Sequence, residues 1–147
     1  MSGSEAASRL SWSWMANLGE LMTGPVVAVA PEDTLGEAAE RMAEHGVGSS
    51  IVLDGGRLIG ILTERDLLKA VAGRVHTSEA RVREWMTQDP VTASESTSVD
   101  EAMRTMLEQG FRHLPVVEGG RTIGVVSLRE LMRSEMQIDV GADAPVD

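Results

Sequence analysis

The chain repeats one segment of its own sequence at a displacement of 64 positions. Aligned without a gap, the two copies share residues along their whole length, including Glu20 and Glu84, Met22 and Met86, Gly46 and Gly110, Gly60 and Gly124, and Arg65 and Arg129. A unit of about 60 residues is marginally stable alone, and a duplicated neighbour offers it a matching surface. We therefore expect the two copies to pack on each other about a pseudo-twofold axis, with their central sheets facing.

The repeat divides the chain into an arm, two repeats, a linker and a tail. The N-terminal arm spans 1–17, the first repeat 18–73, the linker 74–81, the second repeat 82–136 and the flexible acidic tail 137–147. The polar start at 1–8, a linker near 73–80 and the end of the tail at 139–147 are expected to be mobile. Trp12 and Trp14 alternate within the arm as in a strand, which predicts that they anchor it on the fold or on another copy of the chain.

Both repeats predict the same secondary structure. In the first, a short helix at 18–22 and an extended segment at 26–29 precede Thr34-Leu35-Gly36-Glu37, a capping-box sequence that opens an amphipathic helix. Asp54-Gly55-Gly56-Arg57 then separates two apolar runs, as in a β-hairpin, and a second helix at 63–72 closes the unit. The second repeat has a counterpart of each element 64 positions further on.

Composition narrows the classes of partner. Twenty-three acidic residues against 13 basic ones give a net charge of −10, which opposes binding to nucleic acid or to an anionic membrane. The absence of cysteine excludes disulfides, thiol chemistry and cysteine-ligated zinc. No apolar run reaches the roughly 18 residues of a membrane-spanning helix, and the N-terminus lacks a signal-peptide pattern. We expect a soluble, cytoplasmic protein.

One segment of the first repeat combines a strand end, a helix start and two groups suited to a nucleotide. Thr63 opens the second helix, where unpaired backbone amides and the helix dipole attract a phosphate. Asp66, one turn later, is placed to accept hydrogen bonds from the two hydroxyls of a ribose. The same spacing is that of a helix cap, and spacing alone favours the cap. The counterparts in the second repeat are Ser127 and Glu130, and glutamate is the better capping residue.

A segment of the second repeat supplies positive charge at the entrance to a strand. Arg112 is suited to grip a phosphate with two hydrogen bonds, and His113 adds charge as the pH falls. The alternative is a solvated strand start, since the first repeat has uncharged Gly48 and Ser49 at these positions. If the repeats face each other, this segment shares a cleft with the first one. The side chains expected to focus positive potential there are Arg65, Arg112, His113 and Arg129.

Other chemistry is not indicated. The three histidines have no metal-ligand spacing, and no paired carboxylates lie in an apolar setting. Neither a Walker motif nor a Gly-x-Ser-x-Gly elbow is present. We therefore predict neither a metal site nor an enzyme.

In this order and in duplicate, these motifs resemble a tandem pair of CBS domains, the module named after cystathionine β-synthase. The resemblance covers residues 18–136 and rests on the Leu-Met-Thr and Trp-Met-Thr openings, on Leu114-Pro115-Val116-Val117, and on the segments 60–66 and 124–130. It implies an α+β fold of two β-α-β-β-α repeats, paired about a pseudo-twofold axis into a Bateman module. It also implies a flat homodimer of such pairs.

The resemblance further implies a ligand in the cleft between repeats: AMP, ADP or ATP, with magnesium accompanying a triphosphate, or less commonly S-adenosylmethionine. Carried over by position, Thr63 holds phosphate and Asp66 the ribose, and Arg112, His113 and Ser127 contact phosphate. Arg65 is predicted to bind the nucleotide as well, on the ground of its charge. The residues that frame the adenine are Thr23, Val27 and Val47 in the first repeat and Thr87, Val91 and Phe111 in the second. Glu130, in place of the usual aspartate, puts the second site in doubt.

The expected function is that of a non-catalytic regulatory module that senses adenine nucleotides. Ligand between the repeats would change the shape of a dimer or its contact with an effector protein, whose identity the sequence does not reveal. The alternative is an interaction or dimerisation module whose sites have lost their ligand. Glu130 and the uncharged Gly48-Ser49 favour this alternative, and Thr63 with Asp66 opposes it.

Overall fold

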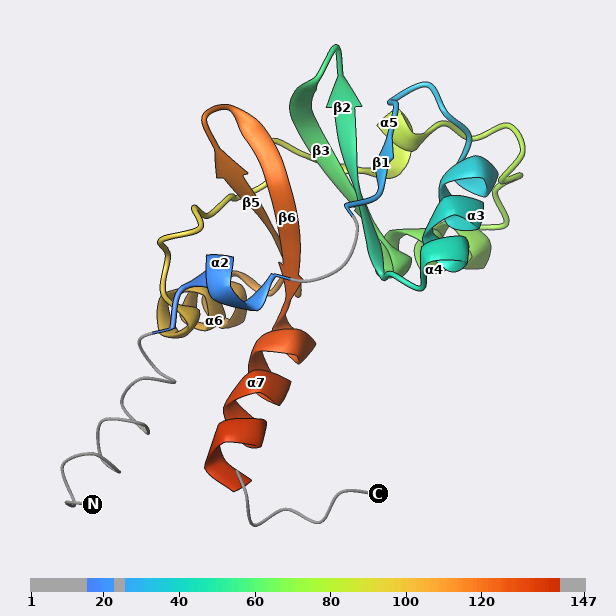
Figure 1. Ribbon diagram of the computed structural model, residues 1–147. Coiled ribbons are helices and arrows are strands. Elements are labelled where there is room, and N and C mark those ends of the chain that lie inside the picture. The colour runs from blue at the N-terminus through green and yellow to red at the C-terminus, as the bar shows by residue number, and fades with distance from the viewer. Residues whose placement is uncertain (1–15, 23–25, 141–147) are drawn as a thin grey trace, which may run out of the picture.

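The computed structural model describes residues 16–22 and 26–140, with side chains as far as residue 135. The chain forms two similar units of helices and strands, and their β-hairpins lie next to each other with helices on the outer sides (Figure 1). The predicted α+β fold of two packed repeats is therefore confirmed. Trp12, Trp14 and Thr23 lie outside the described residues.

The elements follow the predicted order in both repeats. Those of the first are α2 (Leu18–Leu21), β1 (Ala28–Val29), α3 (Leu35–His45), β2 (Ser49–Asp54), β3 (Arg57–Thr63) and α4 (Glu64–Ala72). Those of the second are α5 (Val82–Trp85), β4 (Thr87–Gln88), α6 (Val99–Gln109), β5 (His113–Glu118), β6 (Arg121–Ser127) and α7 (Leu128–Val140).

The predicted caps set the starts and ends of the long helices. Before α3, the Thr34 hydroxyl accepts from the Glu37 amide and the Glu37 carboxylate accepts from the Thr34 amide, both at 3.1 Å. Before α6, the Ser98 hydroxyl accepts from the Glu101 amide at 3.1 Å. Each helix ends at a glycine with positive φ, a conformation that strains other residues: Gly46 (65°) and Gly110 (80°).

Two sheets carry the hairpins. β1, β2, β3 and β4 form one sheet in that order, and β5 and β6 form the other. β4 belongs to the second repeat in sequence, yet it pairs with β3 through Ile61↔Thr87 and so extends the sheet of the first repeat. In the second repeat the segment predicted at 90–93 forms a single parallel bridge, Ala93↔Val116, where the first repeat has strand β1.

The short helices pack on the opposite repeat. The Leu18 amide at the start of α2 donates to the Thr97 carbonyl, and the Val82 amide at the start of α5 donates to the Asp33 carbonyl, both at 2.9 Å. In sequence each short helix precedes its own repeat, but in space each lies on the core of the other. The two contacts are related by the same 64-residue displacement as the sequence, so they obey the predicted pseudo-twofold symmetry.

Each apolar core consequently contains residues from both repeats. One core consists of Ala16 and Leu18 with Val99, Ala102, Met106, Leu114, Val116, Val126 and Leu131. The other consists of Ala80 and Val82 with Val29, Leu35, Ala38, Val52, Leu62 and Ala70. Strands β3 and β6 contact each other where the two units meet. The repeats are thus interlocked rather than merely adjacent.

The linker contacts the first repeat, and the last helix is long. Within the linker, the Thr77 carbonyl accepts from the Gly36 amide at 2.9 Å and Ala80 is buried, so this segment is tied to α3. Helix α7 continues to Val140, past the predicted end of the second repeat at 136, because no glycine or proline interrupts 128–140. In the described ranges, no helix combines the length and the apolar character needed to cross a membrane.

Candidate functional site

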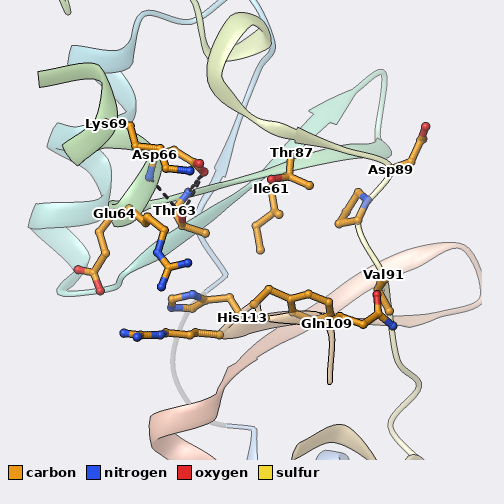
Figure 2. A pocket seen from close by; sticks show the side chains of 15 residues that line it. Ile61, Thr63, Glu64, Asp66, Lys69, Thr87, Asp89, Val91, Gln109 and His113 are labelled. Atoms are coloured by element: carbon orange, nitrogen blue, oxygen red, sulfur yellow. Dashed lines mark hydrogen bonds between the residues drawn. The ribbon is translucent and has the colours of Figure 1, made fainter. Parts of the chain in front are cut away.

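A cavity of about 370 Å³, which we call cavity A, lies between the repeats. One wall comes from the end of β3 and the start of α4, and the other from the segment after β4 and the start of β5 (Figure 2). The lining residues are Ile61, Thr63, Glu64, Arg65, Asp66, Lys69, Thr87, Asp89, Pro90, Val91, Gln109, Gly110, Phe111, Arg112 and His113. Small-molecule pockets have volumes of about 300–1,000 Å³, so a nucleotide-sized ligand fits this space.

Cavity A collects most of the predicted binding residues. These are Thr63, Arg65, Asp66, Thr87, Val91, Phe111, Arg112 and His113. Thr63 and Asp66 from the first repeat face His113 from the second across the cavity (Figure 2). The two segments expected to share one cleft therefore do so.

Thr63 and Asp66 form a reciprocal capping box at the start of α4. The Asp66 Oδ2 atom accepts from the Thr63 amide at 2.8 Å and from the Thr63 hydroxyl at 3.0 Å, and the Asp66 amide donates to the Thr63 hydroxyl at 3.4 Å. In the described part of the chain, Oδ1 of Asp66 accepts no hydrogen bond. The residue thus caps the helix with one oxygen, and its other oxygen accepts no hydrogen bond from the described residues.

The expectation of unpaired amides at the start of α4 is wrong for most of the first turn. The Thr63 and Asp66 amides serve the capping box, and the Glu64 amide donates to the Gly48 carbonyl of the preceding loop at 3.0 Å. The loop before β2 lies close to the start of α4, and the amides there already donate hydrogen bonds within the protein. A phosphate in cavity A would therefore depend on side chains more than on the helix terminus.

The cationic side chains around cavity A are available for that purpose. Arg65 and Lys69 project from α4, and Arg112 lies just before β5. Among the described residues, no carboxylate lies within ion-pair distance of any of the three. They consequently favour an anion in the cavity despite the net charge of −10.

His113 contributes less charge than the sequence suggests. Burial lowers the pKa of its imidazole below the ordinary 6.5, with a smaller lowering from Arg112, while Glu64 and Glu130 oppose the shift. The imidazole is therefore mainly neutral at pH 7. A bound phosphate would restore some of its charge.

A second and larger cavity of about 1030 Å³, cavity B, lies on the other side of the seam between the repeats. It is lined by three further predicted residues: Val27, Val47 and Ser127. Ser127 and Glu130 cap α7 reciprocally, with both hydrogen bonds at 3.1 Å. The predicted set therefore divides between two cavities in the way that the duplication of the sequence requires.

Some lining residues were absent from the predicted set, among them Glu64, Lys69, Asp89 and Gln109. Glu64 is notable because it lines both cavities, together with Arg112 and His113. Its place between Thr63 and Arg65 was a usable signal, since two adjacent residues were already assigned to the site. Gln109 could not be recognised from the sequence, because a polar residue at the end of an amphipathic helix is usually solvated.

Comparison with known proteins agrees with this architecture. The family model described as "CBS domain" matches residues 18–73 and 82–136. The CBS domain-containing protein YhcV of Bacillus subtilis is 30% identical over 130 residues, covering 88% of this chain and 93% of that protein.

Two solved structures are similar in fold and carry ligands. The CBS domain protein PAE2072 from Pyrobaculum aerophilum, complexed with AMP, has 26% identity and a TM-score of 0.74 over 85% of this chain and 99% of its own. The CBS domain pair of protein MJ0100, in complex with 5-methylthioadenosine and S-adenosyl-L-methionine, has 26% identity and a TM-score of 0.72 over 81% of this chain and 94% of its own. The chain belongs to the CBS-domain family, as a tandem pair of CBS domains.

Proposed function

We propose that this CBS pair is a non-catalytic regulatory module that binds an adenine nucleotide, AMP, ADP or ATP, in cavity A. One observation carries the proposal: a hydroxyl and a carboxylate of the first repeat face His113 of the second across one nucleotide-sized space, which Arg112 also lines. Thr63 and the cations would hold phosphate, and Asp66 the ribose. Thr87, Val91 and Phe111 would frame the base, with Thr23, Val27, Val47 and Ser127 in the equivalent places of a second site.

Similar proteins support the class of ligand. PAE2072 is complexed with AMP, and the MJ0100 pair with 5-methylthioadenosine and S-adenosyl-L-methionine. The ligands share an adenosine moiety, which matches the ribose and base positions proposed for cavity A. A triphosphate would bring magnesium with it.

Regulation would follow from the position of the ligand between the repeats. A ligand that contacts both walls of cavity A stabilises one relative orientation of the repeats, because it binds that orientation better than others. We propose that the pair forms a homodimer in the cytoplasm and transmits this change to an effector protein through the dimer shape.

The alternative is a CBS interaction module that binds no nucleotide. It is favoured by the capping role of Asp66 and by the occupied amides at the start of α4. Under this alternative, the titratable groups of cavity A only stabilise the seam.

Thermal unfolding with AMP, ADP or ATP separates the two functions. At a ligand concentration of 100 times Kd, binding adds about 2.7 kcal/mol to the free energy of unfolding. We expect this shift in the wild type and its loss in Asp66→Ala, whose unliganded form should remain within about 1 kcal/mol of the wild type. Glu37→Ala is the matched control, because it removes an equivalent capping carboxylate that lines neither cavity.

Each contrary outcome has a distinct meaning. A wild type that none of the nucleotides stabilises supports the interaction module. An Asp66→Ala variant that loses stability but keeps the full ligand shift shows that Asp66 is only a cap. Product formed on incubation with ATP would contradict the non-catalytic assignment.

A further inference from the structure

Glu64 occupies the seam between the two cavities. It is the first residue of α4, its amide donates to the Gly48 carbonyl at 3.0 Å, and its exposed side chain lines both cavity A and cavity B. Within the described residues, no cation lies within ion-pair distance of its carboxylate. A carboxylate without an ion-pair partner therefore stands beside a site proposed to bind an anion.

Gly48 shows how closely this charge approaches the second repeat. A Cβ atom on Gly48 would lie 3.0 Å from Glu64 Oε1 and 3.2 Å from His113 Nε2. Both groups thus converge on the same small volume, which any side chain at this position would fill. The Glu64 carboxylate of the first repeat and the His113 imidazole of the second thus both lie next to Gly48, and both residues line the two cavities.

The arrangement has no equivalent across the pseudo-twofold axis. The counterpart of Glu64 is Leu128, whose amide makes the same bond, to the Arg112 carbonyl at 2.8 Å. The counterpart of Gly48 is Arg112 itself. A carboxylate at the first position of the helix is therefore not required by the fold, which accepts an apolar residue at the same place in the second repeat.

The direction of a bound nucleotide follows from the proposed function. Figure 2 shows Thr87 and Val91, proposed to frame the base, at one side of cavity A, and Glu64 at the opposite side, with Thr63 and Asp66 between them. A nucleotide with its ribose at Asp66 and its first phosphate at Thr63 directs any further phosphates towards Glu64. The second and third phosphates would then lie near the Glu64 carboxylate, in the part of the cavity that Arg112 and His113 also line.

We propose that Glu64 is a specificity-determining residue that makes the site prefer a nucleoside monophosphate over the di- and triphosphate. The inference rests on the proposed function. Like charges a few ångströms apart at a protein surface change a binding constant by about tenfold. The penalty grows with the number of phosphates beyond the first, so it acts on the ratio of affinities rather than on binding as such.

Isothermal titration with adenosine, AMP and ATP, in EDTA to exclude magnesium, tests the assignment in the full chain. The wild type should bind AMP more tightly than ATP. In Glu64→Gln we expect the Kd of ATP to fall about tenfold, that of AMP about twofold, and that of adenosine to stay unchanged. Glu40→Gln is the control, since it changes the net charge equally from an exposed position on α3 outside both cavities.

The outcomes separate this inference from the function on which it rests. A merely structural role of Glu64 at the helix start would change the three affinities in parallel, and that result overturns the inference, as does an equal change in Glu40→Gln. A wild type that prefers ATP also overturns it, while the nucleotide-binding function stands if Asp66→Ala abolishes binding. A wild type that binds none of the three ligands overturns both.

Discussion

The Met86 side chain fills the space in front of Gly60. A Cβ atom on Gly60 would lie 2.5 Å from Met86 Sδ and 3.0 Å from the Thr87 carbonyl oxygen. Gly60 is on β3 of the first repeat, Thr87 is on β4 of the second, which pairs with β3, and Met86 directly precedes β4. The glycine thus lets the second repeat approach the first closely enough to extend its sheet.

We predict that Gly60→Ala destabilises the fold by about 1–3 kcal/mol, because the new methyl group meets a backbone atom that is fixed by the sheet. Gly124→Ala is the matched comparison. The three atoms nearest to a Cβ there all belong to the side chain of Met22, and an unbranched methionine side chain adapts to a neighbour more easily than backbone does. Urea unfolding should therefore show a larger loss for Gly60→Ala than for Gly124→Ala. Equal losses would mean that the methionines, and not the backbone, limit the approach.

Local sequence rules predicted the elements of this fold but not their exchange between repeats. The capping box of Thr34 and the turn glycines act within a few residues, so the helix start and the hairpin turns could be predicted from the sequence. The placement of α2 and α5 was not readable, because each helix has an apolar face that either core could bury. Only the geometry of the connecting segments decides between the cores, and no residue pattern encodes it.

The candidate site was predictable to a similar extent. The sequence indicated which side chains could bind a nucleotide, namely Thr63, Asp66, Arg112 and His113. The duplication of the chain implied that they line one cleft. The lowered pKa of His113 depends on burial between repeats, which the sequence does not display. Glu64 was overlooked although both of its neighbours were assigned to the site, because only the structure shows that its side chain lines two cavities.

A double-mutant cycle tests the exchange of the short helices. Leu18 is fully buried in the same core as Val99, whereas Leu35 is in the other core. We expect Leu18→Ala to lower the free energy of unfolding by about 2–5 kcal/mol. Its effect should couple to that of Val99→Ala by about 0.5–3 kcal/mol. Combined with Leu35→Ala, the two losses of stability should be nearly additive. Coupling of Leu18 to Leu35 instead of Val99 would place α2 on the core of its own repeat.

Ser50 carries a buried hydroxyl on β2 that has no hydrogen-bond partner among the described residues. Leaving a buried polar group unsatisfied costs about 1–3 kcal/mol. We therefore expect Ser50→Ala to raise the free energy of unfolding by about 1 kcal/mol, measured as a higher urea midpoint at an unchanged slope. Ser49→Ala, also buried but facing cavity B, controls for the loss of a hydroxyl in general. A loss of stability in Ser50→Ala would reveal a partner for this hydroxyl.

His113 should make the stability of the fold depend on pH. Burial lowers the pKa of its imidazole below the 6.5 of the unfolded chain. Between the folded-state pKa and pH 6.5, the unfolded state therefore binds more protons than the folded state. Stability from this group is fully present above pH 6.5 and is lost as the pH falls through the folded-state pKa. The three charged groups that act on it are Glu64 and Glu130, which favour protonation, and Arg112, which opposes it.

Urea unfolding between pH 7.5 and about 5 measures this effect. The wild type should lose stability relative to His113→Gln as the pH falls, because glutamine does not titrate. His45→Gln is the control: His45 is exposed on α3, and its Nδ1 atom lies 2.8 Å from the Arg41 carbonyl oxygen. The His45→Gln variant shows how much of any change follows from replacing a histidine by glutamine as such. If the wild type instead gains stability over His113→Gln on acidification, attraction to Glu64 and Glu130 outweighs the burial of the imidazole, and the direction assigned to its pKa is reversed.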